Sequence, residues 1–242
     1  MIHFIFKKKT NLTDVFPEGY IDIHSHILPG LDDGAKHFEE SLAILSRLTT
    51  FGISKFITTP HIMHGVYDNC LSIITSTTSR FKSNYNEGFS LKSAAEYLID
   101  EHFEKSIAQD SLITLDGKHV LVELSYAMPP LCLHSAIRKL KHFGYVPVLA
   151  HPERYRYYHK TPIVYQELKH AGCKFQLNLL SLTGYYGKST QKVAQNLISE
   201  GFIDYSGTDV HNMQQVEALN KPFSITEKLI RRILENNMFF DF

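Results

Sequence analysis

The feature that most constrains this 242-residue chain is an alternation of short apolar or β-branched runs with segments of helical periodicity. Seven runs are expected to form strands, at residues 20–24, 55–59, 91–97, 119–124, 146–150, 174–178 and 203–206. Strands that alternate with helices are typical of βαβ units and of a mainly parallel sheet. The chain is therefore expected to be an α/β protein.

Helices are predicted most clearly at residues 39–48, at 135–143 and around 193–198, where apolar side chains recur at helical spacing. Glycines stand just before the next run in four places, as helix C-caps do: Gly52, Gly144, Gly172 and Gly201. Seven units without an interruption favour a closed or nearly closed barrel. An open doubly wound sheet would normally carry a G-x-G-x-x-G turn, and the sequence has none.

Composition excludes several classes of protein. Lys plus Arg and Asp plus Glu both number 25, so the chain lacks the overall basic excess that nucleic-acid binders usually show, although a local basic rim around a site is compatible with this balance. No stretch approaches the roughly 20 apolar residues of a transmembrane helix. Residues 1–6 are apolar, but lysines follow them instead of preceding them, which argues against a secretory signal. We expect a cytoplasmic protein with an N-terminal arm at residues 1–19 and a single domain at 20–242.

Side chains that bind metals recur at the ends of the predicted strands. Six of the seven ends present one: His24 and His26, His61, Glu96, Glu123, His151, and Asp209 with His211. In barrels of parallel strands the chemistry gathers at the carboxyl ends, so these side chains are expected to converge. Random placement would scatter them along the helices as well.

Each motif has a plainer interpretation when taken alone. His24 and His26 are two apart on an extended segment and so share a face, where both can bind one ion; alternatively they are surface histidines. Asp22 is placed to orient an imidazole. Glu96 and Glu123 lie in apolar runs, where a buried carboxylate needs a partner, unless each faces solvent. The Asp32-Asp33-Gly34 segment would by itself be a turn.

Taken in order, the motifs resemble those of the polymerase-and-histidinol-phosphatase (PHP) superfamily. They are Asp22-x-His24-x-His26-Ile-Leu-Pro-Gly-Leu-Asp-Asp33-Gly, Thr-Pro-His61, Ala-Ala-Glu96-Tyr, Glu123, Ala-His151-Pro-Glu-Arg154-Tyr and Gly-Thr-Asp209-x-His211. The resemblance covers roughly residues 20 to 235. The first motif is more similar to the bacterial manganese-dependent protein-tyrosine phosphatases of capsule and exopolysaccharide synthesis than to the polymerase or histidinol-phosphatase branches.

The resemblance implies a distorted (β/α)7 barrel of the PHP type that holds three divalent metal ions. Manganese is the family's metal, while histidine and carboxylate ligands also suit Fe, Co or Zn. The implied ligand sets are His24, His26, Glu96 and Asp209 for the first ion; Glu96, Glu123 and His151 for the second; and Asp33 (or Asp32), His61 and His211 for the third. Arg154 would bind phosphate, and Arg154, His61 and Asp209 would be the catalytic residues.

The implied activity is hydrolysis of a phosphomonoester by in-line attack of a metal-bridging hydroxide, without a covalent phosphoenzyme. The implied substrate is a phosphotyrosine protein, the flexible tail of a tyrosine-autophosphorylating kinase of polysaccharide synthesis. One departure from the family is visible. An arginine is expected about five residues after the last histidine, and residues 212–217 contain no basic residue.

Other functions are also compatible with parts of the sequence. Cys132 and Arg138 have the Cys-x5-Arg spacing of a cysteine-dependent phosphatase, but the segment lacks a glycine to cradle phosphate and has a helical pattern. A histidinol-phosphate phosphatase, a nuclease of the same superfamily and a non-catalytic module that keeps metal for structure are further alternatives.

Two minor assignments stay open at the level of sequence. His64 is a candidate general acid or a solvated loop residue. The tyrosines after strand five and in the following loop, Tyr155, Tyr157, Tyr158, Tyr185 and Tyr186, either line the cleft near Arg154 or pack as ordinary aromatics.

Overall fold

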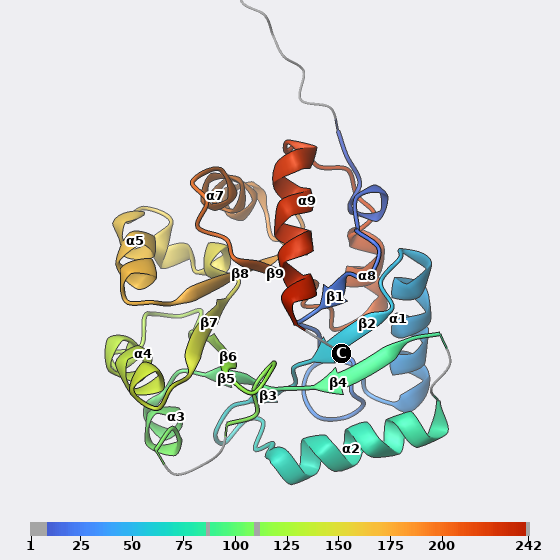
Figure 1. Cartoon of the computed structure of the whole chain (residues 1–242), viewed down its shortest axis with the longest axis horizontal. Helices are drawn as coiled ribbons and strands as arrows, with labels where there is room; N and C mark the ends of the chain where they lie inside the picture. The colour runs from blue at the N-terminus through green and yellow to red at the C-terminus, as the bar shows by residue number, and fades with distance from the viewer. Residues whose placement is uncertain (1–8, 86–87, 109–111, 241–242) are drawn as a thin grey trace, which may run out of the picture.

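The computed structural model describes residues 9–85, 88–108 and 112–240 as parallel strands with helices packed around them (Figure 1). The predictions for the apolar residues 1–6 and for most of the lysines after them lie outside the described residues. Within the described residues no helix is long and apolar enough to cross a membrane.

The strands form two sheets, and every pairing within them is parallel. One sheet has the order β1 (Ile21–Asp22), β2 (Lys55–Thr58), β4 (Ser90–Ser93). The other has the order β3 (His61–Ile62), β5 (Glu96–Leu98), β6 (His119–Glu123), β7 (Val146–Ala150), β8 (Lys174–Asn178), β9 (Tyr205–Gly207). The parallel α/β fold predicted from the sequence is confirmed.

Two of the predicted strands are each divided in two, which accounts for the two sheets. The expected strand at 55–59 continues beyond Pro60 as β3, and the expected strand at 91–97 consists of β4 and β5. Proline has no N–H to offer to the ladder, so pairing breaks there. Two hydrogen bonds keep the two segments side by side across the break. The Ala94 amide donates to the Thr58 carbonyl (2.8 Å), and the Glu96 amide donates to the Pro60 carbonyl (3.1 Å).

The segments that follow β1 and β9 also lie next to each other. The Asp209 amide donates to the His24 carbonyl (2.7 Å), and the His26 amide donates to the Val210 carbonyl (2.9 Å). At the opposite end, the side chain of Asn237 accepts from the Ser206 amide (2.9 Å) and donates to the Ile21 carbonyl (2.8 Å). The first and last strands are thus joined by hydrogen bonds, although not in one continuous sheet, and the seven-unit barrel stays a prediction.

The helices surround the strands (Figure 1). They are α1 (Phe38–Thr50), α2 (Leu71–Asn84), α3 (Glu101–Ser106), α4 (Leu133–His142), α5 (Ile163–His170), α6 (Leu179–Leu182), α7 (Lys188–Ser199), α8 (Met213–Ala218) and α9 (Glu227–Asn236). The predicted helices at 39–48, 135–143 and 193–198 correspond to α1, α4 and α7. Gly52, Gly144, Gly172 and Gly201 all have positive φ after helices, as expected for C-caps.

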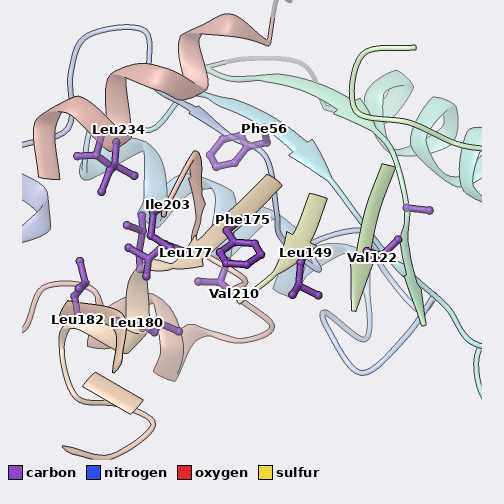
Figure 2. Close-up of a cluster of buried hydrophobic side chains, with 14 of the residues drawn as sticks. Phe56, Val122, Leu149, Phe175, Leu177, Leu180, Leu182, Ile203, Val210 and Leu234 are labelled. Atoms are coloured by element: carbon purple, nitrogen blue, oxygen red, sulfur yellow. The ribbon is translucent and has the colours of Figure 1, made fainter. Parts of the chain in front are cut away.

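Both faces of the central strands are buried. On β6, Val120 and Val122 join the main hydrophobic core beneath the helices, whereas Leu121 packs with Val148 and Ala150 in a separate cluster on the inner face. The same alternation places Phe175 of β8 in the main core (Figure 2). Buried strands of this kind read as nearly continuous apolar runs, which is how they were detected in the sequence.

The alternation also determines where polar side chains point. Glu123 is two residues after Leu121 on β6, so its side chain points to the same, inner face. Gln176 is next to Phe175 on β8, so its side chain points away from the main core and also lies on the inner face. Each stands toward the carboxyl end of its strand, where no further apolar residue covers it. The inner face therefore changes from an apolar packing cluster to a polar site along the strand direction.

The chain before the first strand packs on the same core. Leu12 and Val15 are buried among the main cluster, and Thr10 forms a two-residue antiparallel bridge with Phe223. Residues 9–19 therefore contribute to the core of the domain, although the predicted division at residue 19 rests on sequence alone.

Phe175→Ala is expected to lower the free energy of unfolding by about 3–5 kcal/mol, because a fully buried ring is removed and the cavity closes only in part. Phe143→Ala, at a ring that is 48% exposed, should cost less than about 1 kcal/mol. Urea denaturation of both variants measures the difference; equal costs would contradict the assignment of Phe175 to the core.

Candidate metal centre

Four predicted ligands meet at the carboxyl ends of the first, third and last strand units. The Nε2 atom of His24 lies 3.1 Å from Glu96 Oε2 and 3.3 Å from Asp209 Oδ1. The Nε2 atom of His26 lies 3.3 Å from each of the same two oxygens. Two imidazole nitrogens and two carboxylate oxygens thus face one another in the buried interior. This is an arrangement that a divalent ion with nitrogen and oxygen ligands can occupy.

Glu96 lies between this group and a second one. Its Oε2 atom is 3.3 Å from His61 Nδ1, while its Oε1 atom is 3.2 Å from His151 Nε2. Glu123 is 2.9 Å from His61 through its Oε1 atom. Because the two oxygens of Glu96 face different imidazoles, this carboxylate is positioned to bridge neighbouring ions.

A third group lies nearer the surface. Asp33 Oδ1 is 3.5 Å from His61 Nε2 and 3.5 Å from His211 Nε2, and the His211 ring stacks on His26 at 4.0 Å between centroids. Among the described residues, three overlapping sets place their ligand atoms within 4.8 Å of one another. They are His26, Asp33, His61 and His211; His24, Glu96, His151 and Asp209; and His61, Glu96 and Glu123.

The structure separates the roles of the two adjacent aspartates. Asp32 is buried, accepts from the amides of Gly34 (2.9 Å) and His61 (3.0 Å), and lies 2.7 Å from His26 Nδ1. Burial opposes its ionisation, but the His26 imidazole and the Gly34 amide hold the pKa of Asp32 well below its usual value. The Asp33 side chain is 53% exposed and faces His61 and His211. Asp32 therefore orients the His26 ring, and Asp33 is the one free to bind an ion.

The expectation that Asp22 orients an imidazole is wrong. Its carboxylate accepts from the Thr208 amide (2.9 Å) and from the His24 amide (3.4 Å), so it fixes the backbone between the first and last strands. Gln176, at the end of β8, takes the expected role: its Oε1 atom lies 2.8 Å from His24 Nδ1. A glutamine can do this because the orientation of a ring requires an acceptor and not a charge.

Two ligands stand in a backbone conformation that side chains rarely adopt. His151 has φ 36° and Asp209 has φ 52°, both in the left-handed region, one residue after the end of β7 and two residues after the end of β9. Residues other than glycine in this region carry a strain of roughly 1–3 kcal/mol, and such strain concentrates at functional sites. This backbone conformation places both side chains at the cluster, where His151 Nε2 lies 3.2 Å from Glu96 Oε1 and Asp209 Oδ1 lies 3.3 Å from His24 Nε2.

Two glycines allow the chain to pack closely around the histidines. A Cβ atom on Gly34 would lie 2.0 Å from the His26 carbonyl oxygen, and one on Gly207 would lie 2.6 Å from His24 Cβ. Neither glycine has positive φ, so each is required for space and not for conformation. Gly34 thus allows the loop that carries Asp32 and Asp33 to fold back onto the end of the first strand.

The polar atoms of the cluster are not satisfied by the protein alone. Four buried polar atoms of these side chains make no hydrogen bond of acceptable geometry among the described residues: His61 Nδ1, Glu96 Oε1, Glu123 Oε1 and His151 Nδ1, although His61 Nδ1 and Glu123 Oε1 lie 2.9 Å apart. Such orphan atoms are rare in native proteins unless an ion or water takes them. Their donor types, imidazole nitrogens and carboxylate oxygens, fit divalent cations.

Electrostatics leads to the same conclusion. Burial alone would raise the pKa of Glu96 and of Asp209, yet His24 and the other imidazoles lower both well below their usual values. Burial would lower the pKa of His24, but Glu96 and Asp209 raise it to about 9. Without a metal ion, the buried carboxylates need protonated imidazoles beside them to balance their negative charge. Divalent metal ions bound at the same place can supply that positive charge instead.

Arg154 is fixed at the edge of the cluster. Its Nη1 atom donates to Asp209 Oδ2 (2.7 Å), and its guanidinium lies over the rings of Tyr126 (4.9 Å) and Tyr186 (4.1 Å). Asn178 donates to the same Asp209 oxygen (2.7 Å) and to the Tyr186 hydroxyl (3.2 Å). The two rings and the carboxylate hold the guanidinium in a defined orientation.

A cavity of about 310 Å³ opens onto these side chains. Predicted residues that line it include Asp33, His61, Glu123, His151, Arg154, Asp209 and His211. Sequence reasoning missed Tyr67 and Tyr126, which also line it. Tyr126 follows Glu123 by three residues and so stands in the loop after a strand end, a position that could have marked it as a candidate.

The other tyrosines fall into two groups. Tyr155 and Tyr158 are buried in the main core, with the Tyr155 hydroxyl accepting from the Leu124 amide (2.9 Å), and Tyr157 is partly buried against the same core. Tyr185 and Tyr186 line a second cavity that also contains Arg154. The packing interpretation therefore holds for Tyr155, Tyr157 and Tyr158, and the cleft interpretation holds for Tyr185 and Tyr186.

The rival motifs lie elsewhere. Cys132 is the N-cap residue of α4, with Arg138 within that helix, and burial raises the pKa of its thiol. A raised pKa disfavours the thiolate that a cysteine nucleophile needs. The His64 side chain is 60% exposed, stacks on His102 and does not line the cavity at the cluster.

The segment after the last histidine has a structural role where an arginine was expected. The side chain of Gln215 accepts from the His211 amide, and Glu217 pairs with Arg47 of α1 (2.7 Å). Helix α8 contains no basic residue. Among the described residues, the cations that line the cavities at this end of the strands are Arg154 and Arg156.

Comparison with known proteins identifies one family. Residues 20–241 match the family described as capsular polysaccharide synthesis, CpsB/CapC. Tyrosine-protein phosphatase YwqE of Bacillus subtilis is 31% identical over 198 residues, which are 80% of this chain and 78% of the relative. A putative tyrosine-protein phosphatase, CapC of Staphylococcus aureus, is 25% identical over 211 residues, 86% of this chain and 81% of the relative.

A solved structure gives the same result for the fold. It belongs to a pair, YwqE from Bacillus subtilis and CpsB from Streptococcus pneumoniae, described as unique metal-dependent tyrosine phosphatases. It superposes with a TM-score of 0.75 at 28% identity and covers 81% of each chain. The family resemblance inferred from the ordered motifs is confirmed.

Asp32→Asn is expected to weaken divalent-metal binding by roughly 10–100-fold, because the hydrogen bond that orients His26 is weakened. Calorimetric titration of the metal-free protein with Mn²⁺ measures this. Asp14→Asn, at an exposed aspartate of the N-terminal segment, is the control and should bind as the unchanged protein does. Unaltered affinity in Asp32→Asn would contradict the positioning role.

Proposed function

The chain belongs to the CpsB/CapC family of capsular polysaccharide synthesis, and from this premise we propose that it is a metal-dependent protein-tyrosine phosphatase. The observation that carries the proposal is the cluster of nine imidazole and carboxylate side chains, seven of them buried and some with polar atoms that lack a hydrogen bond, next to a fixed arginine. Relatives over most of the chain are named tyrosine-protein phosphatases, which favours this substrate over histidinol phosphate or nucleic acid.

We propose that the site holds three divalent ions, with manganese as the family's metal. His24, His26, Glu96 and Asp209 would hold one, Glu96, Glu123 and His151 a second, and Asp33, His61 and His211 a third. When bound, such ions neutralise phosphate oxygens and lower the pKa of a coordinated water. The distorted seven-unit barrel belongs to the same proposal, supported by the hydrogen bonds between the segments after β1 and β9.

The residues of the chain then have defined tasks. Arg154 donates one N–H to Asp209, and its other donors remain available for the equatorial oxygens of a phosphate. His61 contacts Glu96, Glu123 and Asp33, so it fixes the spacing between the second and third groups. Asp209 joins the arginine to the metal ligands, so that a phosphate bound by Arg154 lies against the cluster.

The proposed substrate is a phosphotyrosine protein, with the tail of a tyrosine-autophosphorylating kinase as the candidate and a cytoplasmic location. The wide opening of the site supports a polypeptide substrate, since a second cavity adjoins the first and shares Tyr126 and Arg154 with it. A histidinol-phosphate phosphatase would act on a small metabolite and would have no use for that additional space.

His24→Ala is expected to abolish at least about 99% of the hydrolysis of p-nitrophenyl phosphate and of a phosphotyrosine peptide, because ligands in one cluster act as a unit. EDTA should do the same to the unchanged protein, and added Mn²⁺ should restore activity only there. Colorimetric phosphate release measures both.

Cys132→Ser is the discriminating control and should keep full activity, and His170→Ala, at the end of α5, should too. Activity that survives EDTA and His24→Ala but is lost in Cys132→Ser would refute the metal mechanism. Turnover of histidinol phosphate with none of the phosphotyrosine peptide would refute the substrate assignment.

Arg154→Lys is expected to lower kcat/KM for a phosphotyrosine peptide by about 100-fold, because the planar two-point donor and its contacts with both tyrosine rings are lost. Arg138→Lys on α4, outside both cavities, is the matched control and should change little. Steady-state kinetics tests this, and equal values for both variants would exclude phosphate binding by Arg154.

A further inference from the structure

A second cavity of about 650 Å³ lies beside the cavity at the metal cluster. The two share Tyr126 and Arg154, so Arg154 stands at their junction. Arg156, Tyr185, Tyr186 and Thr190 are among the other residues that line the second cavity, and none of its lining residues is acidic. A substrate group bound at Arg154 therefore has a cationic and aromatic space next to it.

Arg156 is held in place by its neighbours in sequence. It begins the short 3-10 helix Arg156–Tyr158, in which Tyr158 is buried. The Tyr157 hydroxyl donates to the Ser125 carbonyl (2.9 Å), which ties this helix to the loop after β6. The backbone that presents Arg156 is thus anchored by the buried Tyr155 and Tyr158 and by the hydrogen bond of Tyr157.

The charge of Arg156 is not neutralised by the protein. Among the residues that the structure describes, no carboxylate forms an ion pair with Arg156, whereas Arg47, Arg154 and Arg231 each have one. An exposed arginine is ordinarily of little consequence. Here, however, Arg156 lines a cavity beside a second arginine, Arg154. Among the described residues, Asp209 is the one carboxylate that forms an ion pair with either guanidinium group, and it also contacts His24 of the metal cluster.

We propose that this second cavity binds an acidic side chain of the substrate polypeptide, one to three residues from the phosphotyrosine, with Arg156 as the specificity-determining residue. The inference rests on the proposed phosphatase function. An extended peptide advances about 3.3 Å per residue, so a neighbouring side chain reaches a cavity that adjoins the phosphate site. A carboxylate between the arginine and the Thr190 hydroxyl would gain charge-assisted hydrogen bonds.

The inference also gives a function to the sequence departure after the last histidine. About five residues after His211, where the family pattern predicts an arginine, this chain has no basic residue, and Gln215 in this segment accepts a hydrogen bond from the His211 amide. The positive charge that this chain offers beyond Arg154 lies in the second cavity, at Arg156. Selection of an acidic neighbour in that cavity would therefore distinguish the substrate of this chain.

The test compares phosphotyrosine peptides in which one Asp is placed at each position from three residues before to three residues after the phosphotyrosine, with Asn at that position as the reference. The unchanged, Mn²⁺-loaded protein is expected to favour Asp by about fivefold in kcat/KM at one or more positions, the upper range for a solvent-accessible ion pair. Raising the salt concentration from 0.05 to 0.5 M should reduce this ratio because screening increases.

Arg156→Gln is expected to bring the Asp-to-Asn ratio at that position to about 1, and Arg156→Glu to favour a Lys peptide over the Asp peptide. Arg138→Gln, an equal loss of charge on α4, should keep the ratio of the unchanged protein. These results together would establish the subsite.

An Asp-to-Asn ratio of 1 at every position in the unchanged protein would overturn the proposal, and so would a preference that persists in Arg156→Gln. Neither result would affect the proposed function, because the phosphotyrosine peptides would still be hydrolysed. Absence of hydrolysis of every peptide and of p-nitrophenyl phosphate would instead overturn the phosphatase assignment itself.

Discussion

The cluster of buried carboxylates and imidazoles at the strand ends is the constraint on which the rest of the structure depends. Glu96 and Asp209 are buried completely, and burial of an uncompensated carboxylate is strongly unfavourable. The imidazoles around them supply positive charge only while protonated. The fold therefore keeps these groups within 3.1–3.3 Å of one another, in an arrangement whose natural counter-charge is a divalent cation.

Much of the surrounding structure can be understood as support for that cluster. Asp32 and Gln176 each engage the second nitrogen of a histidine, so the ring orientation does not depend on the ion alone. Gly34 and Gly207 allow close approach of the backbone, and His151 and Asp209 adopt left-handed backbone conformations just after the strand ends. The apolar clusters on either side of the strands provide the free energy that tolerates this strain.

How much could be predicted from the sequence differs between the ligands and their supports. The ligands stand in motifs such as His24-x-His26, because chelation needs certain residue types at fixed spacing along one strand. The supports are less visible. Gln176 and Tyr126 contact the site through pairs far apart in the sequence, and neither an amide nor a phenol by itself indicates a metal site. The error over Asp22 has the same origin, because sequence proximity to His24 does not reveal that its partner is Thr208.

By itself the sequence determined the order of strands and helices, the parallel α/β class, the family and the nine candidate ligands, because each depends on local periodicity or on a motif within one segment. Only the tertiary structure decided which ligands face each other, that Asp33 and not Asp32 faces His61 and His211, and that Arg156 lines a cavity beside Arg154. These properties depend on the angle at which each strand end meets its neighbours, and that angle is set by packing across the whole domain.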